Sequence, residues 1–176
     1  MPSIKRRPPT DSDEARLVID QQYYLPIFFT GIANQWSRGA SKVFLHLYGV
    51  GFLDWVVISM LAVEPGTTAL GICQNTSSDK AAVSRCLSQL ESKRLVTGEA
   101  EGRDPRRRRL QLTAEGYRLH DKLMAIAVER ENQLLQGLGE DDIATLVGLL
   151  RRVKSNIQAI KERDTAAVSP DRQDLW

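Results

Sequence analysis

The stretch "GRDPRRRRLQLT", residues 102–113, combines a turn, a run of arginines and an alternating strand pattern. It holds five arginines and one acidic residue, and its last four residues alternate between apolar and polar. Another short apolar run, residues 95–97, precedes it across a segment rich in glycine and acidic residues. Two such runs separated by a turn are typical of a β-hairpin, and we expect its second strand at 108–113.

Two helices are predicted directly before this hairpin. Thr67 or Thr68 can cap a short helix that ends near residue 74, and Ser77 or Ser78 can cap a second helix that ends near residue 93. The second helix has a single apolar face, made by Val83, Leu87 and Leu90. Two helices joined by a short turn and followed by a two-stranded ribbon form a winged helix-turn-helix.

In a winged helix-turn-helix the second helix enters the major groove of DNA with its N-terminal residues at the base edges. Arg85 can form two hydrogen bonds with a guanine or hold a phosphate. The residues at this end of the helix are small, hydroxylic or basic, and we expect them to contact double-stranded DNA: Ser77, Ser78, Lys80, Ala81, Ser84 and Arg85.

The charge of the hairpin supports the same function. Residues 77–113 contain nine cationic and five acidic side chains, so this segment carries +4 and the rest of the chain −2 of the net +2. Exposed arginines repel one another, but beside phosphates they are favoured by attraction and counterion release. We expect Arg106, Arg107 and Arg108 to contact DNA, one arginine at the tip to enter a narrow minor groove, and Asp104 to orient Arg106.

Further helices are predicted on both sides of this unit. Residues 25–48, with Pro26 in the first turn, and residues 53–63 form two before it, and Thr113 caps a long helix that Gly137 and Gly139 end. The last helix begins near residue 141 and carries apolar residues spaced by three and four. This heptad pattern favours packing on a partner chain, hence a homodimer, through Ile143, Leu146, Leu150, Val153, Ile157 and Ile160.

From about residue 32 to residue 160 the chain resembles the MarR family of bacterial winged-helix regulators. The wing shows the family's Asp-x-Arg, here Asp104 and Arg106, followed after five residues by Leu112-Thr113. "DKAAVSRCLSQLESKRLV" (79–96) and "GFLDWVVISMLA" (51–62) resemble other family segments. Ser77 and Ser78 stand where the family often has glycine and an apolar residue. The resemblance implies an obligate homodimer built from N- and C-terminal helices, a pseudo-palindromic operator, and repression relieved by a small ligand.

In the family, ligands enter a crevice between the dimerisation helices and the winged-helix unit. We expect an anionic aromatic effector, a phenolic or aromatic carboxylic acid or its CoA thioester, because aromatic walls and a cation are available. The candidate residues are Trp36, Arg38, Ser41, Trp55 and His120. The alternative is that the tryptophans are core residues and that Arg38 and His120 are solvated.

Two other functions remain open at this stage. Some MarR-type regulators sense oxidants through cysteine, and Cys73 and Cys86 are candidates for such a redox-sensing role. The other alternative is a basic helical module that binds RNA or protein. An enzyme is not expected, and neither a metal nor a cofactor, because His46 and His120 are the only histidines and no nucleotide loop, metal-ligand spacing or nucleophile motif is present.

The sequence predicts a mostly α-helical protein with a small β-hairpin wing, a winged helix-turn-helix with terminal dimerisation helices. We expect a flexible N-terminal arm at 1–20, a dimerisation and effector helix at 21–50, the DNA-binding unit at 51–113, dimerisation helices at 114–162 and a tail at 163–176. Neither a signal peptide nor a membrane span is predicted, and the two cysteines do not form a secreted-type disulfide framework, so a cytoplasmic location is expected.

Overall fold

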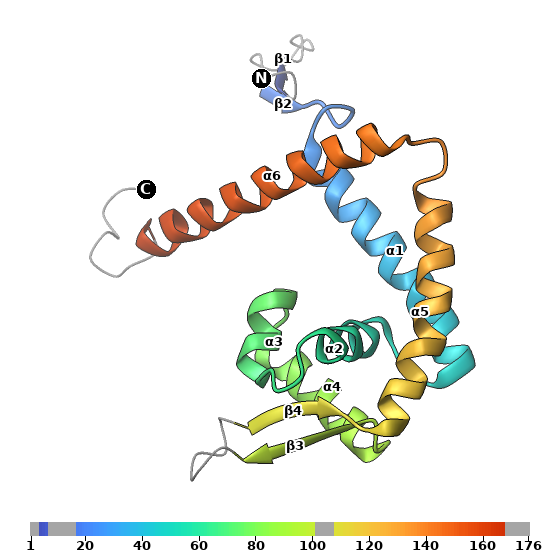
Figure 1. The fold of residues 1–176 in the computed structure, drawn as a ribbon. Coiled ribbons are helices and arrows are strands. Elements are labelled where there is room, and N and C mark those ends of the chain that lie inside the picture. Colours follow the sequence, from blue (N-terminus) through green and yellow to red (C-terminus); the bar gives the residue numbers. More distant parts are fainter. Residues whose placement is uncertain (1–3, 7–16, 101–107, 168–176) are drawn as a thin grey trace. The chain divides into compact units, whose positions relative to one another are not determined.

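The computed structural model describes residues 4–6, 17–100 and 108–167, which fall into two compact units, residues 1–124 and residues 125–176. The described part is mostly helical with one β-hairpin, as the sequence predicts, and it has a second small antiparallel sheet that the sequence does not predict (Figure 1). The elements follow in the order β1 (Ile4–Arg6), β2 (Leu17–Ile19), α1 (Leu25–Tyr48), α2 (Phe52–Val63), α3 (Ala69–Thr76), α4 (Lys80–Ser92), β3 (Val96–Ala100), β4 (Arg108–Leu112), α5 (Ala114–Leu134) and α6 (Glu140–Ala167).

Helix α1 has the bounds that the sequence predicts. Pro26 lies in its first turn, where the missing N–H costs nothing. Gly49 ends the helix in the left-handed conformation, with φ 65°, and its N–H donates to the carbonyl oxygen of Leu45 at 3.0 Å. No single helix among the described residues is long and apolar enough to cross a membrane, while α1 and α2, bent by 82°, pass that test only as a pair.

Helix α2 is the centre of the first unit, since α1, α3, α4 and β4 all pack against it. Its N-terminus is capped by Asp54, whose Oδ2 accepts a hydrogen bond from Gly51 N at 2.8 Å. The buried core around α2 is mostly aliphatic, and its fully buried large side chains are Phe44, Val50, Val57, Ile58, Leu61, Ile72, Val83, Leu90 and Leu123.

The turn between α3 and α4 corrects one prediction. Thr68 caps α3, as expected, by accepting from Gly71 N at 3.2 Å. The cap of α4 is Asp79, whose Oδ1 accepts from Ala82 N at 2.7 Å, so the prediction of Ser77 or Ser78 as the cap is wrong. The physical reason is that α3 extends to residue 76, and Ser77 takes the left-handed conformation, with φ 54°, as its C-cap.

The wing is the predicted hairpin, with a longer first strand than expected. Strand β3 pairs with β4 in antiparallel register from Val96↔Leu112 to Ala100↔Arg108. The other edge of β4 is also paired, because Gly66 N donates to Leu110 O at 2.7 Å and Leu110 N donates to Thr67 O at 3.2 Å. Strand β4 is therefore hydrogen-bonded on one edge to β3 and on the other edge, at Leu110, to the turn that precedes α3.

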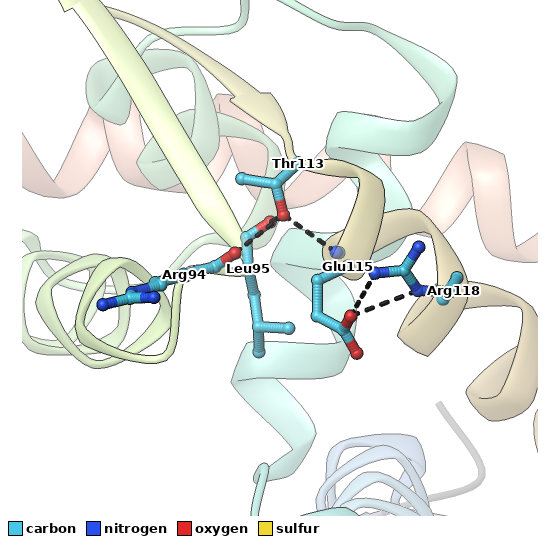
Figure 2. A network of polar contacts seen from close by, with 6 residues as sticks. Arg94, Leu95, Thr113, Glu115 and Arg118 are labelled. Atoms are coloured by element: carbon cyan, nitrogen blue, oxygen red, sulfur yellow. Dashed lines mark hydrogen bonds and ion pairs between the residues drawn. The ribbon is translucent and has the colours of Figure 1, made fainter.

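The junction between the wing and α5 is a small polar network (Figure 2). Thr113 Oγ1 donates to the carbonyl oxygen of Arg94 at 2.7 Å and accepts from Gly116 N at 3.0 Å, which confirms Thr113 as the cap of α5. Gly116 is buried, and a Cβ there would lie 2.1 Å from the carbonyl oxygen of Leu95. On the exposed side, Arg118 forms an ion pair with Glu115, and this hydrogen bond lowers the pKa of the Glu115 carboxyl.

The second unit holds the end of α5 and helix α6. Gly139 N donates to Asp142 Oδ2 at 3.1 Å at the start of α6. The helix reaches residue 167, so residues 163–167 are helical where the sequence predicted a tail. Ile143 and Val153 are partly exposed, and the other four residues of the heptad pattern are between 41% and 51% exposed: Leu146, Leu150, Ile157 and Ile160.

The N-terminal region also differs from the flexible arm that the sequence predicted. Strands β1 and β2 pair in antiparallel fashion, with Ile4 opposite Ile19. The apolar side chains of Ile4, Leu17 and Ile19 are exposed by half or more. The flexible arm was predicted from the hydrophilic composition of the N-terminal residues. The apolar triplet at 17–19 is the part of this region that is typical of a strand.

Candidate nucleic-acid interface

Helix α4 has one exposed polar face and one buried apolar face. Lys80, Ala81, Ser84 and Arg85 are exposed and, at spacings of one and four residues, lie on the same face of the helix. Ser77 is exposed and Ser78 is partly buried in the turn that leads into it. The structure thus brings together the six residues that the sequence singled out for DNA contact on this helix. We call the face made by Lys80, Ser84 and Arg85 the α4 face.

The opposite side of α4 is fixed by apolar packing and by one buried acid. The apolar side of the helix is buried in the core of the first unit through Val83, Leu87 and Leu90. Asp54 on α2 is only 6% exposed, and its Oδ2, which caps α2, also accepts from Gln89 Nε2 at 3.4 Å. The sequence indicated Asp54 only as a first-turn acid, because nothing local showed that Gln89 would reach it. Asp54 thereby orients α4 relative to α2.

The two cysteines lie in different environments. Cys86 is buried, and burial, followed by a hydrogen bond to Asp54, raises the pKa of its thiol. The thiolate is the form that reacts with oxidants, so Cys86 is poorly suited to redox sensing. Cys73 is free and partly exposed. Within the described residues, histidine, cysteine and acidic side chains form no group that could hold a metal ion.

Arg108 is placed differently from a freely exposed wing arginine. Its Nη1 lies 2.6 Å from Glu91 Oε1 on α4, and its Nε donates to the carbonyl oxygen of Gly98 at 3.1 Å. The side chain is still 44% exposed. The sequence grouped Arg108 with the DNA-contacting arginines, whereas the structure turns it toward α4. The other predicted wing contacts, Asp104, Arg106 and Arg107, lie outside the described residues.

A hollow of about 690 Å³ lies between α3, α4 and β4, next to the α4 face. Lys80 and Ser84 line it on the α4 side, and Cys73 lines it on the α3 side. Glu91 and Arg108 form part of its wall. Residues of the wing and of the α4 face therefore line the same open hollow, and Lys80 places a positive charge at its edge.

The candidate effector residues have different surroundings in the first unit. Trp55 stacks on His120 with ring centroids 5.9 Å apart, and Phe44 contacts the same tryptophan at 5.9 Å. Ser41 Oγ accepts from the backbone of residue 52 at 3.0 Å, and Trp36 is partly buried. Arg38 instead lines a separate open hollow on α1, beside Tyr24, Thr30 and Gln35.

Comparisons with known proteins agree with this architecture. No protein-family model matches the chain. Over 100 residues it is 27% identical to the transcriptional regulator HosA of Escherichia coli O157:H7, a match that covers 57% of this chain and 74% of HosA. The structure of a MarR/EmrR family transcriptional regulator from Acinetobacter sp. ADP1 superimposes with a TM-score of 0.75 and 27% identity, over 80% of this chain and 99% of that one.

A complex of MepR from S. aureus with DNA has the same fold, with a TM-score of 0.69 and 21% identity over 78% of this chain and 99% of the MepR chain. HosA and the Acinetobacter protein are both transcriptional regulators, in agreement with the non-enzymatic function expected from the sequence. With its helix-turn-helix and its paired wing, the chain is similar in sequence and in fold to transcriptional regulators of the MarR family.

Proposed function

We propose that the chain is a dimeric repressor that binds a pseudo-palindromic operator in double-stranded DNA and is released by a small anionic aromatic ligand. The observation that carries DNA binding is the α4 face, where Lys80, Ser84 and Arg85 are exposed on one side of a helix that Asp54 and the core hold firmly. The fold shared with MepR, which was solved in complex with DNA, supports the same proposal.

In this proposal the N-terminal half of α4 enters the major groove. Small side chains at Ser77, Ser78 and Ala81 allow the backbone to approach the bases, and Arg85 reads a guanine or holds a phosphate. The wing follows the adjacent backbone, with Arg106 and Arg107 near the minor groove and Asp104 orienting Arg106. Residues 51–113 then form the DNA-binding unit.

The dimer is proposed to form through residues 21–50 and 114–162. The exposed apolar residues of α6, which include Leu146, Leu150 and Ile157, repeat at heptad spacing and support this assignment. A two-fold dimer places its two α4 helices in successive major grooves, so its half-sites lie about one helical turn apart.

The effector proposal depends on the aromatic group around Trp55. Trp55 and His120 form a stacked pair that joins α2 to the first turns of α5, and Ser41 joins α1 to α2. An aromatic acid that displaces His120 from Trp55 would change this junction. Titration calorimetry with phenolic and aromatic carboxylic acids and their CoA thioesters, together with release of bound DNA, tests the proposal, and the absence of both heat and release would exclude it.

Selection of bound duplexes from random DNA tests the central claim. An enriched inverted repeat with half-sites about one helical turn apart is the expected result. Binding of the enriched duplex should fall steeply with salt and exceed binding of random duplex by a large factor. A Lys80→Ala, Arg85→Ala variant is expected to lose the enrichment, whereas an Arg118→Ala variant, which removes a cation near the start of α5, should keep it. No enrichment with the wild-type chain would exclude the proposal.

A further inference from the structure

We propose that the ion pair between Glu91 and Arg108 fixes the wing against α4, so that Arg108 is a positioning residue for DNA binding and not a DNA contact. This inference rests on the proposed function and deepens it. Arg108 then has a different role from its neighbours in the arginine run. Glu91, although acidic, then favours the binding of DNA.

The register of the ribbon determines which way Arg108 faces. Side chains alternate between the two faces of a strand, and Leu110 and Leu112 on β4 are buried. Arg108 therefore continues the row that faces α4, while Arg109 belongs to the other face, and its side chain lies beside Gly66. The run of arginines is thus divided by strand geometry, not by local sequence.

A glycine in the partner strand makes room for the Arg108 guanidinium. Gly98 lies opposite Leu110, and a Cβ on Gly98 would be 2.7 Å from Arg108 Nε and 3.0 Å from Cζ. Arg108 Nε also donates to the carbonyl oxygen of Gly98 at 3.1 Å. Across the other side, Nη1 reaches Glu91 Oε1 at 2.6 Å. Arg108 is thus held at both ends of its guanidinium.

This contact lies at the outer end of the described part of the wing. The bridge to Thr67 holds β4 at Leu110, whereas Arg108 lies two residues nearer the tip, in the outermost pair, Ala100↔Arg108. Glu91 lies in the last turn of α4. The ion pair therefore joins the outer end of the described ribbon to α4, the proposed recognition helix.

Charge provides a test of sign. If Glu91 acted only through its negative charge, removing it would strengthen binding to DNA, because phosphates repel a nearby carboxylate. If Glu91 holds the wing, removing it weakens binding, because the wing must then be ordered when DNA binds. The same change in charge at Glu99, which lies on the outer face of the ribbon opposite Arg109, is the matched control.

The first experiment measures hydrogen exchange in the 176-residue chain without DNA. Glu91→Gln is expected to speed exchange of the backbone amides at the outer ends of β3 and β4, and Glu99→Gln to leave them unchanged. Circular dichroism and thermal unfolding verify that both variants fold. Unchanged exchange in Glu91→Gln would overturn the proposal, and this readout does not depend on whether the protein binds DNA.

The second experiment measures affinity for the duplex enriched by selection. Glu91→Gln and Arg108→Gln are each expected to weaken binding by about threefold to tenfold, since a partly exposed ion pair contributes little and two wings act together. Glu99→Gln is expected to bind equally well or better. The slope of log K against log salt should not change in Arg108→Gln, whereas a fall of about 1 per wing would identify a phosphate contact and overturn the proposal.

A charge exchange separates positioning from net charge. Arg108→Glu with Glu91→Arg restores an ion pair in the same place, whereas Arg108→Glu with Glu99→Arg has the same net charge without it. The first double variant is expected to bind DNA more tightly and to exchange its ribbon amides more slowly than the second. Equal behaviour of the two would overturn the proposal. Wild-type protein that selects no duplex would contradict the proposed function alone, and the exchange data would still decide the role of the ion pair.

Discussion

The hydroxyl of Thr113 donates to the carbonyl oxygen of Arg94 at 2.7 Å, and so fastens the start of α5 to the turn between α4 and β3 (Figure 2). The same oxygen caps α5 by accepting from Gly116 N. One side chain thus completes the wing and begins the next helix. We expect Thr113→Val to lower the free energy of unfolding by about 1–2 kcal/mol, measured by urea denaturation, because both bonds are lost at similar side-chain volume. Thr113→Ser keeps the hydroxyl and should cost much less, and an equal loss in both variants would contradict this account.

Gly116→Ala is expected to destabilise the protein by about 1–3 kcal/mol or more, because its Cβ would overlap the carbonyl oxygen of Leu95 and backbone must move. Urea denaturation measures the loss. The control is Gly148→Ala in α6, where a Cβ meets nothing within 4 Å and the helix should gain up to about 1 kcal/mol. Equal effects of the two substitutions would show that contact with Leu95 is not the cause.

The buried thiol of Cys86 predicts a pH dependence of stability. Burial and the contact with Asp54 raise the pKa of this thiol in the folded state, so above about pH 8.5 the unfolded chain releases a proton that the folded chain keeps. Stability is thus fully present below that pH and falls as the pH rises. The stability of wild type relative to Cys86→Ala should decrease by up to about 1.4 kcal/mol per pH unit there. Unfolding free energies at pH 7.5 and 9.5 check this, and a constant difference would contradict it.

Exposed apolar residues on α6 predict the effect of charges placed there. Leu150→Asp with Ile157→Asp is expected to give a folded monomer that has lost affinity for the operator, since charges cannot be buried in the proposed interface. Sedimentation measures the assembly state. Thr145→Asp with Ser155→Asp adds the same charge to the same helix away from the heptad positions and should leave a dimer. A dimer in both cases would remove the assignment of α6.

Arg85 on the α4 face is expected to contribute to base reading. Arg85→Ala should weaken operator binding by about 1–3 kcal/mol and, if the guanidinium reads a guanine, should broaden the selected sequence at one position of each half-site. A uniform loss across sequences would instead indicate a phosphate contact. Affinity and specificity equal to those of wild type would contradict the orientation proposed for α4.

Local rules predicted much of this fold. Periodicity with Pro26 and Gly49 gave the exact bounds of α1, and Thr68 and Thr113 cap the helices expected of them. The sequence prediction placed the cap of α4 at Ser77 or Ser78, because several residues that can cap a helix follow one another there. Ser77 instead ends α3 in the left-handed conformation, and Asp79 is the cap of α4.

The candidate interface was predicted less completely than the fold, because the contacts that position its side chains join segments far apart in the sequence. Helical spacing gathers the residues of the α4 face. The inward turn of Arg108 follows from strand register and from Glu91, 17 positions earlier. The bond from Gln89 to Asp54 spans 35 positions. Neither contact can be predicted from the residues next to it in the sequence. The polar composition of the segment after residue 163 likewise does not indicate that α6 continues to residue 167.

The short corner between α1 and α2 is fastened to the C-terminal half of α4 at two points. Lys93 Nζ donates to the carbonyl oxygen of Gly49, and Asp54, which holds the amide of Gly51, also meets Gln89. These contacts connect the corner directly to α4. A rotation at the end of α1 would therefore be passed on to α4, the helix whose exposed face is proposed to meet DNA.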